Sequence, residues 1–171
     1  MSNSWVRLLL LFILLVLLQV WLFNKIHLWG IITPLTYIYF ILKLPVEMNR
    51  NSVLFLSAFL GLTVDLFAST LGLNMLATTV AGFSRIYLLK LFSPRDLFES
   101  YSPSFYTFGK SLFLRYAGLM ILLHQIVLFS AEALSLFDPP ALALRIAGSS
   151  TLTLILVFAF EKMDKSKTEA R

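Results

Sequence analysis

The sequence predicts an all-α integral membrane protein, a single bundle of six transmembrane helices with both termini in the cytoplasm. Three observations support this fold class. Of 171 residues, 58% are hydrophobic and only 13% are charged, whereas soluble proteins average about 25% charged residues. The apolar runs approach the roughly 20 residues that a helix needs to cross a bilayer, and are too long for the alternating strands of a membrane barrel. Basic residues are also unevenly distributed between the predicted loops.

Six apolar segments account for most of the chain. We predict spans at about residues 5–23, 28–44, 52–70, 73–92, 111–134 and 141–160. The first has a leucine-rich body, as a signal peptide does, but bulky residues follow it instead of a small-residue cleavage site, so we expect it to be retained. Pro34 should kink the second span without breaking it, because neighbouring helices can satisfy the freed carbonyl.

Short connections join these spans. A tight turn at residues 71–74 links the third and fourth spans, and a polar stretch at residues 93–110 precedes the fifth. This stretch is the longest connection and is too short for a catalytic domain, so residues 1–171 are predicted to form a single transmembrane domain. Residues 161–171 form a charged cytoplasmic tail.

The basic residues follow the positive-inside rule for this topology. Lys25 and Arg145 lie on one side, and Arg85 and Arg115 lie within spans. The other ten lie on the side that holds both termini: Arg7, Lys43, Arg50, Lys90, Arg95, Lys110, Lys162, Lys165, Lys167 and Arg171. This side is therefore predicted to be cytoplasmic. Topology then explains the net charge of +5, and we expect no nucleic-acid binding.

Small and polar residues recur at helical spacing along the third and fourth spans. The candidate residues for helix packing or partner docking are Ser57, Gly61, Asp65, Ser69, Gly72, Asn74, Thr78, Gly82 and Arg85. Helices in lipid associate through close backbone packing and interhelical hydrogen bonds, so such stripes mark contact faces. A purely structural role in this bundle and a site for a partner or ligand are both open.

Asp65 and Arg85 are charged, and a charge near the middle of a membrane helix costs about 2.5 to 3.5 kcal/mol on insertion scales. Their backbones differ in depth by roughly 9 Å at 1.5 Å per residue. Side chains lean toward the helix N-terminus, which brings these two closer, so a direct or water-bridged pair is one expectation. The alternative is that Arg85 extends to the cytoplasmic surface beside Lys90.

A second polar seam follows one face of the fifth span, at Arg115, Gly118, Gln125 and Glu132. Such a seam lines a cavity or a partner interface, or it is structural.

No pattern in the chain indicates catalysis. His124 and His27 lie at different depths and form no metal-ligand cluster. Motifs of nucleotide-binding and hydrolytic enzymes are absent, and Ser69 near Asp65 lacks a histidine or lysine base. We therefore expect no catalytic residue, no cofactor and no metal.

Several short motifs occur in a characteristic order. They are Gln19 with Phe23-Asn24, Gly30 and Pro34 in TPLTYIYFILKLP, Gly61-Leu62 with Asp65, Leu71-Gly72-Leu73-Asn74, and Arg85 before Ser93-Pro94-Arg95. In this order and spacing the chain resembles the rod shape-determining protein MreD family, in particular its short form in Bacteroidetes. The resemblance covers nearly the whole chain and is clearest between residues 30 and 95.

This resemblance implies a non-catalytic subunit of the cell-elongation complex in the bacterial cytoplasmic membrane. It implies binding to an MreC-like protein within the bilayer. It also implies action, direct or indirect, with MreB, RodA and a penicillin-binding protein in lateral peptidoglycan synthesis and cell-shape maintenance. The stripes would then serve packing and docking, and the basic loops would approach anionic lipid or cytoplasmic partners.

The competing class is the substrate-binding component of energy-coupling-factor vitamin transporters, whose six-span architecture the MreD family resembles. Such components dock through an Ala-x-x-x-Ala motif on the first helix, and the first span here contains no alanine. A ligand site would need convergent polar groups at the extracytoplasmic end, for which Asn74, Gln125 and Glu132 are candidates. A sealed bundle favours the adaptor, and a polar cavity open outward favours transport.

Overall fold

The computed structural model describes residues 2–26, 31–70, 72–92, 101–133 and 138–169, and these residues contain helices and no strand. Residues 27–30, Leu71 and the motif at 93–95 lie outside the described residues. The elements are α1 (Ser2–Trp21), η1 (Phe23–Lys25), α2 (Ile38–Lys43), α3 (Arg50–Ala68), α4 (Leu73–Phe92), α5 (Phe105–Phe108), α6 (Lys110–Glu132) and α7 (Pro139–Glu169). Within this part of the chain, five helices are long and apolar enough to cross a membrane: α1, α3, α4, α6 and α7. The all-helical, membrane-type class predicted from the sequence is thereby confirmed.

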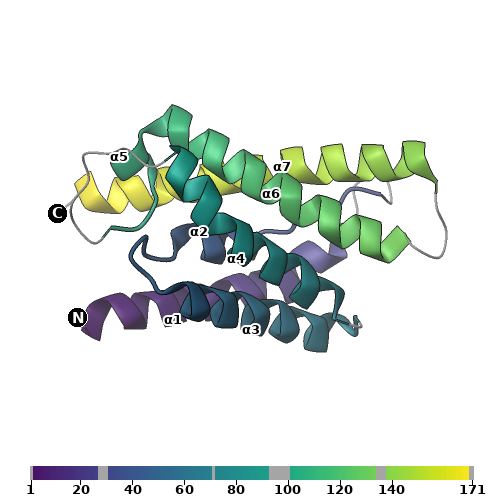
Figure 1. The fold of residues 1–171 in the computed structure, drawn as a ribbon, viewed down its shortest axis with the longest axis horizontal. Coiled ribbons are helices and arrows are strands. Elements are labelled where there is room, and N and C mark those ends of the chain that lie inside the picture. The colour runs from purple at the N-terminus through teal and green to yellow at the C-terminus, as the bar shows by residue number, and fades with distance from the viewer. Residues whose placement is uncertain (1, 27–30, 71, 93–100, 134–137, 170–171) are drawn as a thin grey trace.

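The long helices form a bundle in which α3 packs on α4, α4 on α6, and α6 on α7, while α1 lies against α3 (Figure 1). The N-terminal end of α1 and the C-terminal end of α7 lie at the same end of the bundle, here called the terminus end (Figure 1). The α3–α4 turn lies at the opposite end, here called the turn end. This arrangement places the polar side chains at defined positions along the bundle.

The second predicted span is not a continuous helix, which corrects the expectation for residues 28–44. Residues 33–35 are extended, a turn follows at 36–37, and only Ile38–Lys43 forms the short helix α2. Pro34 lacks an N–H group and disfavours helical geometry in the residue before it, and Pro45 prevents continuation of α2. Residues 33–44 are all buried, and α2 packs against α1, α4 and α6. We call residues 31–45 the central segment.

Two helix ends also differ from the sequence prediction. α3 ends at Ala68, and Ser69 follows with a positive φ of 55°, exposed at the end of the helix and not on its buried stripe. α7 continues to Glu169, beyond the predicted end of the sixth span at residue 160. Glu161, assigned from sequence to a charged tail, is consequently buried within the bundle.

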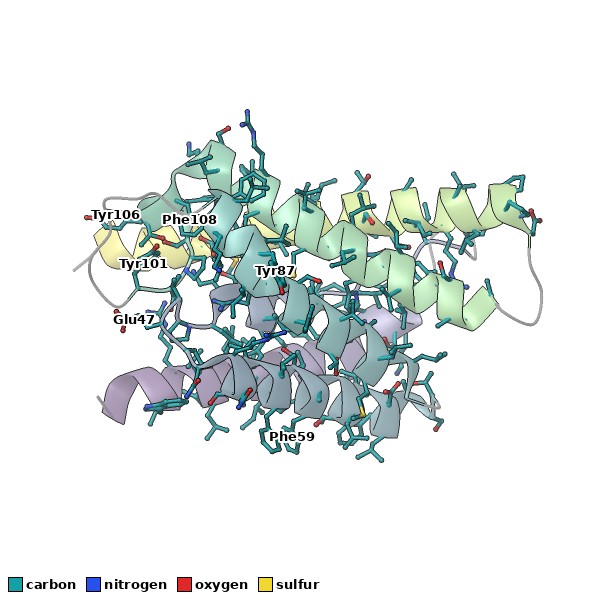
Figure 2. The ribbon with its side chains drawn as sticks, in the orientation of Figure 1. Glu47, Phe59, Tyr87, Tyr101, Tyr106 and Phe108 are labelled. Atoms are coloured by element: carbon teal, nitrogen blue, oxygen red, sulfur yellow. The ribbon has the colours of Figure 1, made fainter. Side chains whose placement is uncertain are left out.

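Apolar side chains cover both the interior and the outer helix faces. At the terminus end, Tyr101 and Phe108 lie with their ring centroids 6.1 Å apart, whereas Phe59 points outward from α3 (Figure 2). Trp21 and Phe55 are among many large hydrophobic residues that are mostly exposed. Soluble monomers rarely expose apolar surface on this scale. The outer faces are therefore those expected of helices that contact lipid.

Candidate functional site

The contact between α3 and α4 is made by the small residues of the two stripes. A Cβ atom added at Gly61 would overlap Thr78 Oγ1 and the backbone of Met75, and one added at Gly82 would overlap Ser57. All four stripe residues are buried. The missing side chains let the two backbones approach closely, which is the main source of helix association in lipid.

Asp65 caps the N-terminus of the neighbouring helix. Its carboxylate accepts hydrogen bonds from the backbone N–H groups of Asn74 (3.1 Å) and Met75 (2.9 Å), at the first turn of α4. It also accepts from the Asn74 amide at 2.8 Å and from the Thr70 hydroxyl. The first N–H groups of a helix lack intrahelical partners and carry positive partial charge, so a carboxylate is stabilised there. This location explains how an acid is accommodated in an apolar segment.

Arg85 caps the C-terminal end of α2. Its Nε donates to the Ile41 carbonyl at 3.1 Å, and its Nη2 donates to the carbonyls of Leu44 and of Pro45, the latter at 3.3 Å. These carbonyls end a short helix that proline prevents from continuing, and a cation complements their negative partial charge. The Arg85 side chain is 1% exposed.

A direct Asp65–Arg85 pair and a surface position for Arg85, both considered from the sequence, are therefore wrong. No hydrogen bond or ion pair joins Asp65 to Arg85 in the described part of the chain, because each is engaged at a different helix end. Arg85 also does not reach the surface beside Lys90, since its guanidinium is held inside by the central segment.

Side chains from α1 and α7 satisfy the extended part of the central segment. Gln19 donates to the Pro34 carbonyl at 3.0 Å and accepts from the Thr36 N–H at 2.8 Å. The N–H of Thr33 donates to Ser149 Oγ, and that of Leu35 to Thr153 Oγ1, from the opposite side of the segment. Non-helical backbone persists at membrane depth only where protein groups supply such partners.

A third polar cluster lies at the terminus end. Glu161 accepts hydrogen bonds from the Tyr39 hydroxyl (2.7 Å), the Lys43 ammonium (2.9 Å) and the Phe105 N–H (3.1 Å). It thus joins α7, α2 and α5. Sequence reasoning missed this cluster. The positive-inside rule had placed Lys43 and the end of the last span on the same side of the membrane, and this shared side was the signal from which a contact between Lys43 and Glu161 could have been predicted.

A buried polar chain continues inward from Asp65. Asn74 Oδ1 accepts from the Tyr37 hydroxyl at 2.6 Å, and that hydroxyl lies 3.1 Å from His124 Nε2. His124 is fully buried and its Nδ1 has no hydrogen-bond partner among the described residues. No group of three metal-ligating side chains occurs in this part of the structure. This series of hydrogen-bonded side chains connects α3, α4, the central segment and α6 through neutral groups and one carboxylate.

The polar seam of the fifth span does not form one buried face in α6. Gln125 is buried and donates to Thr153 at 3.0 Å, but Arg115 is exposed. Glu132, also exposed, forms an ion pair with Arg145 at 3.0 Å. A Cβ atom at Gly118 would meet nothing within 4 Å, so this glycine supports no close contact in the bundle.

A cavity of about 380 Å³ lies at the turn end. Apolar residues of several helices line it, together with the polar residues Asn24, Thr33, Thr70, Asn74, Glu132 and Arg145. Of the three sequence-predicted ligand residues, Asn74 and Glu132 reach this cavity and Gln125 does not. Most of its polar groups already have partners: Asn74 bonds to Asp65 and Tyr37, Asn24 to Gln19, and Glu132 to Arg145.

Comparison with known proteins identified no relative of this chain. A scan against protein-family models, a search of curated proteins and a search of solved structures each found no match to the chain.

Proposed function

We propose that this protein is a non-catalytic membrane adaptor of the MreD type, which binds an MreC-like protein in the bacterial cytoplasmic membrane. In that role it supports the complex of MreB, RodA and a penicillin-binding protein that carries out lateral peptidoglycan synthesis. The supporting observation is that four of the residues carrying the MreD resemblance form hydrogen bonds around one structural feature, the central segment. Gln19, Asn24 and Pro34 bond at the extended part of the central segment, and Arg85 bonds at its other end.

The use of the polar groups also favours an adaptor. Asp65 and Arg85 hold helix ends, and Gln19 and Thr153 hold extended backbone, so these groups are engaged within the bundle. The stripes on α3 and α4 likewise pack against each other inside the bundle. In this proposal they promote docking indirectly, because they fix the hairpin whose outer faces meet a partner's transmembrane helix.

We further propose that the chain crosses the membrane six times with both ends cytoplasmic. Extended chain advances about 3.3 Å per residue and helix 1.5 Å, so residues 31–35 and 38–43 together have length for roughly 25 Å, close to the approximately 30 Å of the hydrocarbon core. Single cysteines at Lys162 and Asp138 test this topology, because the chain has no native cysteine. An impermeant maleimide should label Asp138→Cys in intact spheroplasts and Lys162→Cys only after permeabilisation. Labelling of both in intact spheroplasts would contradict the topology.

The adaptor proposal is tested by affinity purification of the tagged chain from its native membrane. Recovery of a membrane-anchored MreC-like protein, together with loss of rod shape on depletion, is the expected result. Arg85→Gln should reduce the recovered partner because it releases the central segment, whereas the exposed Arg115→Gln should not. Purification of the chain with a transporter ATPase complex and no MreC-like protein would overturn the proposal.

A second candidate function is small-molecule binding, as in the substrate-binding component of a vitamin transporter. The cavity at the turn end is the observation that favours it. Mass spectrometry of small molecules extracted from the purified chain distinguishes the two functions. A stoichiometric polar metabolite lost in Glu132→Gln but retained in Arg115→Gln would favour transport, and its absence would favour the adaptor.

A further inference from the structure

The two helices of the α3–α4 hairpin turn different kinds of surface away from the bundle. Between its first and last turns, α3 exposes large apolar side chains: Phe55, Phe59, Leu62 and Leu66. α4 lies between α3 and α6 (Figure 1), and its outward side mixes apolar with polar residues. We call this side the α4 outer face; it consists of the exposed residues Leu76, Phe83, Tyr87 and Lys90, with the half-buried Ser84 at its edge.

Two hydroxyl groups of the α4 outer face, those of Ser84 and Tyr87, have no hydrogen-bond partner among the described residues. Thr79 of the same helix differs, because its hydroxyl donates to the Met75 carbonyl at 2.7 Å. Ser84 lies eight residues before the end of α4 at Phe92, which is roughly 12 Å at 1.5 Å per residue and close to the bilayer centre. Lipid tails offer no hydrogen-bonding group at this depth.

The Tyr87 side chain is directed away from the head groups at the terminus end. Side chains of a helix lean toward its N-terminus, and the N-terminus of α4 lies at the turn end. The Tyr87 ring accordingly lies beside the ring of Phe83, one turn deeper, with their centroids 5.8 Å apart. Polar side chains at such depth join transmembrane helices through interhelical hydrogen bonds. The two hydroxyls therefore favour a neighbouring helix over lipid on this face.

Positive charge borders the α4 outer face at the terminus end. The Arg50 guanidinium lies over the Phe83 ring, 4.5 Å from its centroid, and Lys90 is exposed. Neither forms an ion pair with another described residue, Glu47 included. Stacking on Phe83 fixes the position of the Arg50 charge without neutralising it. A carboxylate at the terminus end of an incoming helix would complement this charge.

The same charge disfavours a second copy of this chain as the occupant. Two copies in one membrane share their orientation, so a symmetric contact through the α4 outer face would bring each Arg50 and each Lys90 to the depth of its counterpart. Like charges placed together at an interface oppose association. A different protein can carry an acid at this position.

We propose that the α4 outer face binds one transmembrane helix of a different membrane protein. This helix carries Asp or Glu at the terminus end and a polar side chain opposite Ser84 or Tyr87. The inference rests on the adaptor function for the existence of a partner, and it adds the face and the chemistry by which that partner is recognised. The apolar side of α3 then faces lipid.

Photocrosslinking of the full chain in its native membrane tests this inference, because the hairpin offers two phenylalanines at matched depth. Phe83 lies nine residues before the end of α4 and is 43% exposed, and Phe59 lies nine residues after the start of α3 and is 49% exposed. Benzoylphenylalanine in place of Phe83 should crosslink to a transmembrane helix of another protein with Asp or Glu at the terminus end. In place of Phe59 it should crosslink to lipid. Mass spectrometry of the crosslinked peptide identifies the helix.

Charge exchange tests whether the recognition is specific. Arg50→Glu should lower the crosslink from position 83 roughly tenfold, and replacement of the partner's acid by arginine should restore it. If Arg50→Glu does not fold, Arg50→Gln replaces it. Ser84→Ala and Tyr87→Phe should each lower the crosslink roughly threefold, the effect of one interhelical hydrogen bond. Arg115→Glu changes an exposed basic residue of α6 and should leave the crosslink unchanged.

Several results would overturn the inference: crosslinks from position 83 to a second copy or to lipid alone, equal crosslinking of the partner from position 59, or no recovery after charge exchange. The adaptor function would survive these results if the MreC-like protein still copurified. Conversely, a charge-restored crosslink to another membrane protein, with no MreC-like protein in the purified complex, would overturn the adaptor function and retain the docking face.

Discussion

The α3–α4 hairpin and the central segment both bury backbone inside a membrane bundle, but they satisfy that backbone differently. Within the hairpin, the helices supply their own hydrogen bonds, and small residues such as Gly61 and Gly82 allow close packing. The central segment depends on side chains of other elements: Gln19, Thr153 and Arg85. The difference teaches that buried polar residues in this protein serve mainly to satisfy main-chain groups. A buried charge here is thus a structural requirement before it is an indication of chemistry.

The comparison predicts the largest effect at Arg85. Glutamine is too short to replace the Arg85 donors to the buried carbonyls of Ile41 and Leu44, whereas the part-buried Pro45 carbonyl keeps the Met48 N–H at 3.3 Å. Each unsatisfied buried group costs about 1–3 kcal/mol. We expect the free energy of unfolding in micelles to fall by roughly 3 kcal/mol or more. Denaturant titration followed by circular dichroism measures this change.

Arg115→Gln is the matched control for Arg85→Gln, because Arg115 is exposed on α6 and makes no hydrogen bond to the described residues. It should change the free energy of unfolding by less than about 0.5 kcal/mol. Equal effects of the two variants would show that the central segment does not depend on its Arg85 cap.

The hairpin provides the second prediction, through a pair of glycines in equivalent secondary structure. Gly61→Ala forces a methyl group into Thr78 and the α4 backbone, and overpacking of this kind costs about 1–3 kcal/mol. Gly118→Ala meets open space and should be neutral or stabilising by up to about 1 kcal/mol, because alanine favours helix. Thermal unfolding of the two variants, followed side by side, measures the difference. A stable Gly61→Ala protein would mean that α3 and α4 separate without loss.

Asp65 provides the third prediction, at the junction between the two helices of the hairpin. Asp65→Asn keeps one acceptor oxygen but loses the charge at the α4 N-terminus and one N–H acceptor, so we expect a loss of about 1–2 kcal/mol. Asp138 is the control, since its carboxylate accepts from the Ala141 N–H at 3.3 Å at the start of α7 and is exposed. Asp138→Asn should cost at most a few tenths of a kcal/mol, because asparagine is an equally good N-cap. Chemical denaturation of both variants gives the comparison, and equal losses would argue that burial of Asp65 is irrelevant.

Sequence reasoning predicted the α3–α4 hairpin correctly but not the structure of the central segment. The spans of α3 and α4 and the small residues between them follow from apolar runs and local spacing, which tertiary contacts leave unchanged. The central segment was predicted as a kinked helix, because Pro34 alone does not show that Gln19 and Thr153 compensate for the loss of helical bonds. The partners of Arg85 lie about 40 residues away in the sequence, at Ile41 and Leu44. Spacing along one helix carries no information about such contacts.

The smallest predicted effect compares two threonines of α7: Thr153, which hydrogen-bonds to the backbone of another segment, and Thr151, which hydrogen-bonds to its own helix. Thr153 Oγ1 accepts from the Leu35 N–H at 3.0 Å and from Gln125, whereas Thr151 Oγ1 donates to the Ala147 carbonyl of its own helix and is exposed. Valine conserves the shape of threonine, so Thr153→Val leaves the Leu35 N–H unpaired and should cost about 1 kcal/mol or somewhat more. Thr151→Val should be nearly neutral, because the Ala147 carbonyl keeps its helical bond. Hydrogen exchange offers the sharper measurement: the Leu35 amide should lose protection in Thr153→Val and keep it in Thr151→Val. Unchanged protection in Thr153→Val would mean that packing alone holds the extended chain, and side-chain capping would then apply to α2 and α4 but not to residues 33–36.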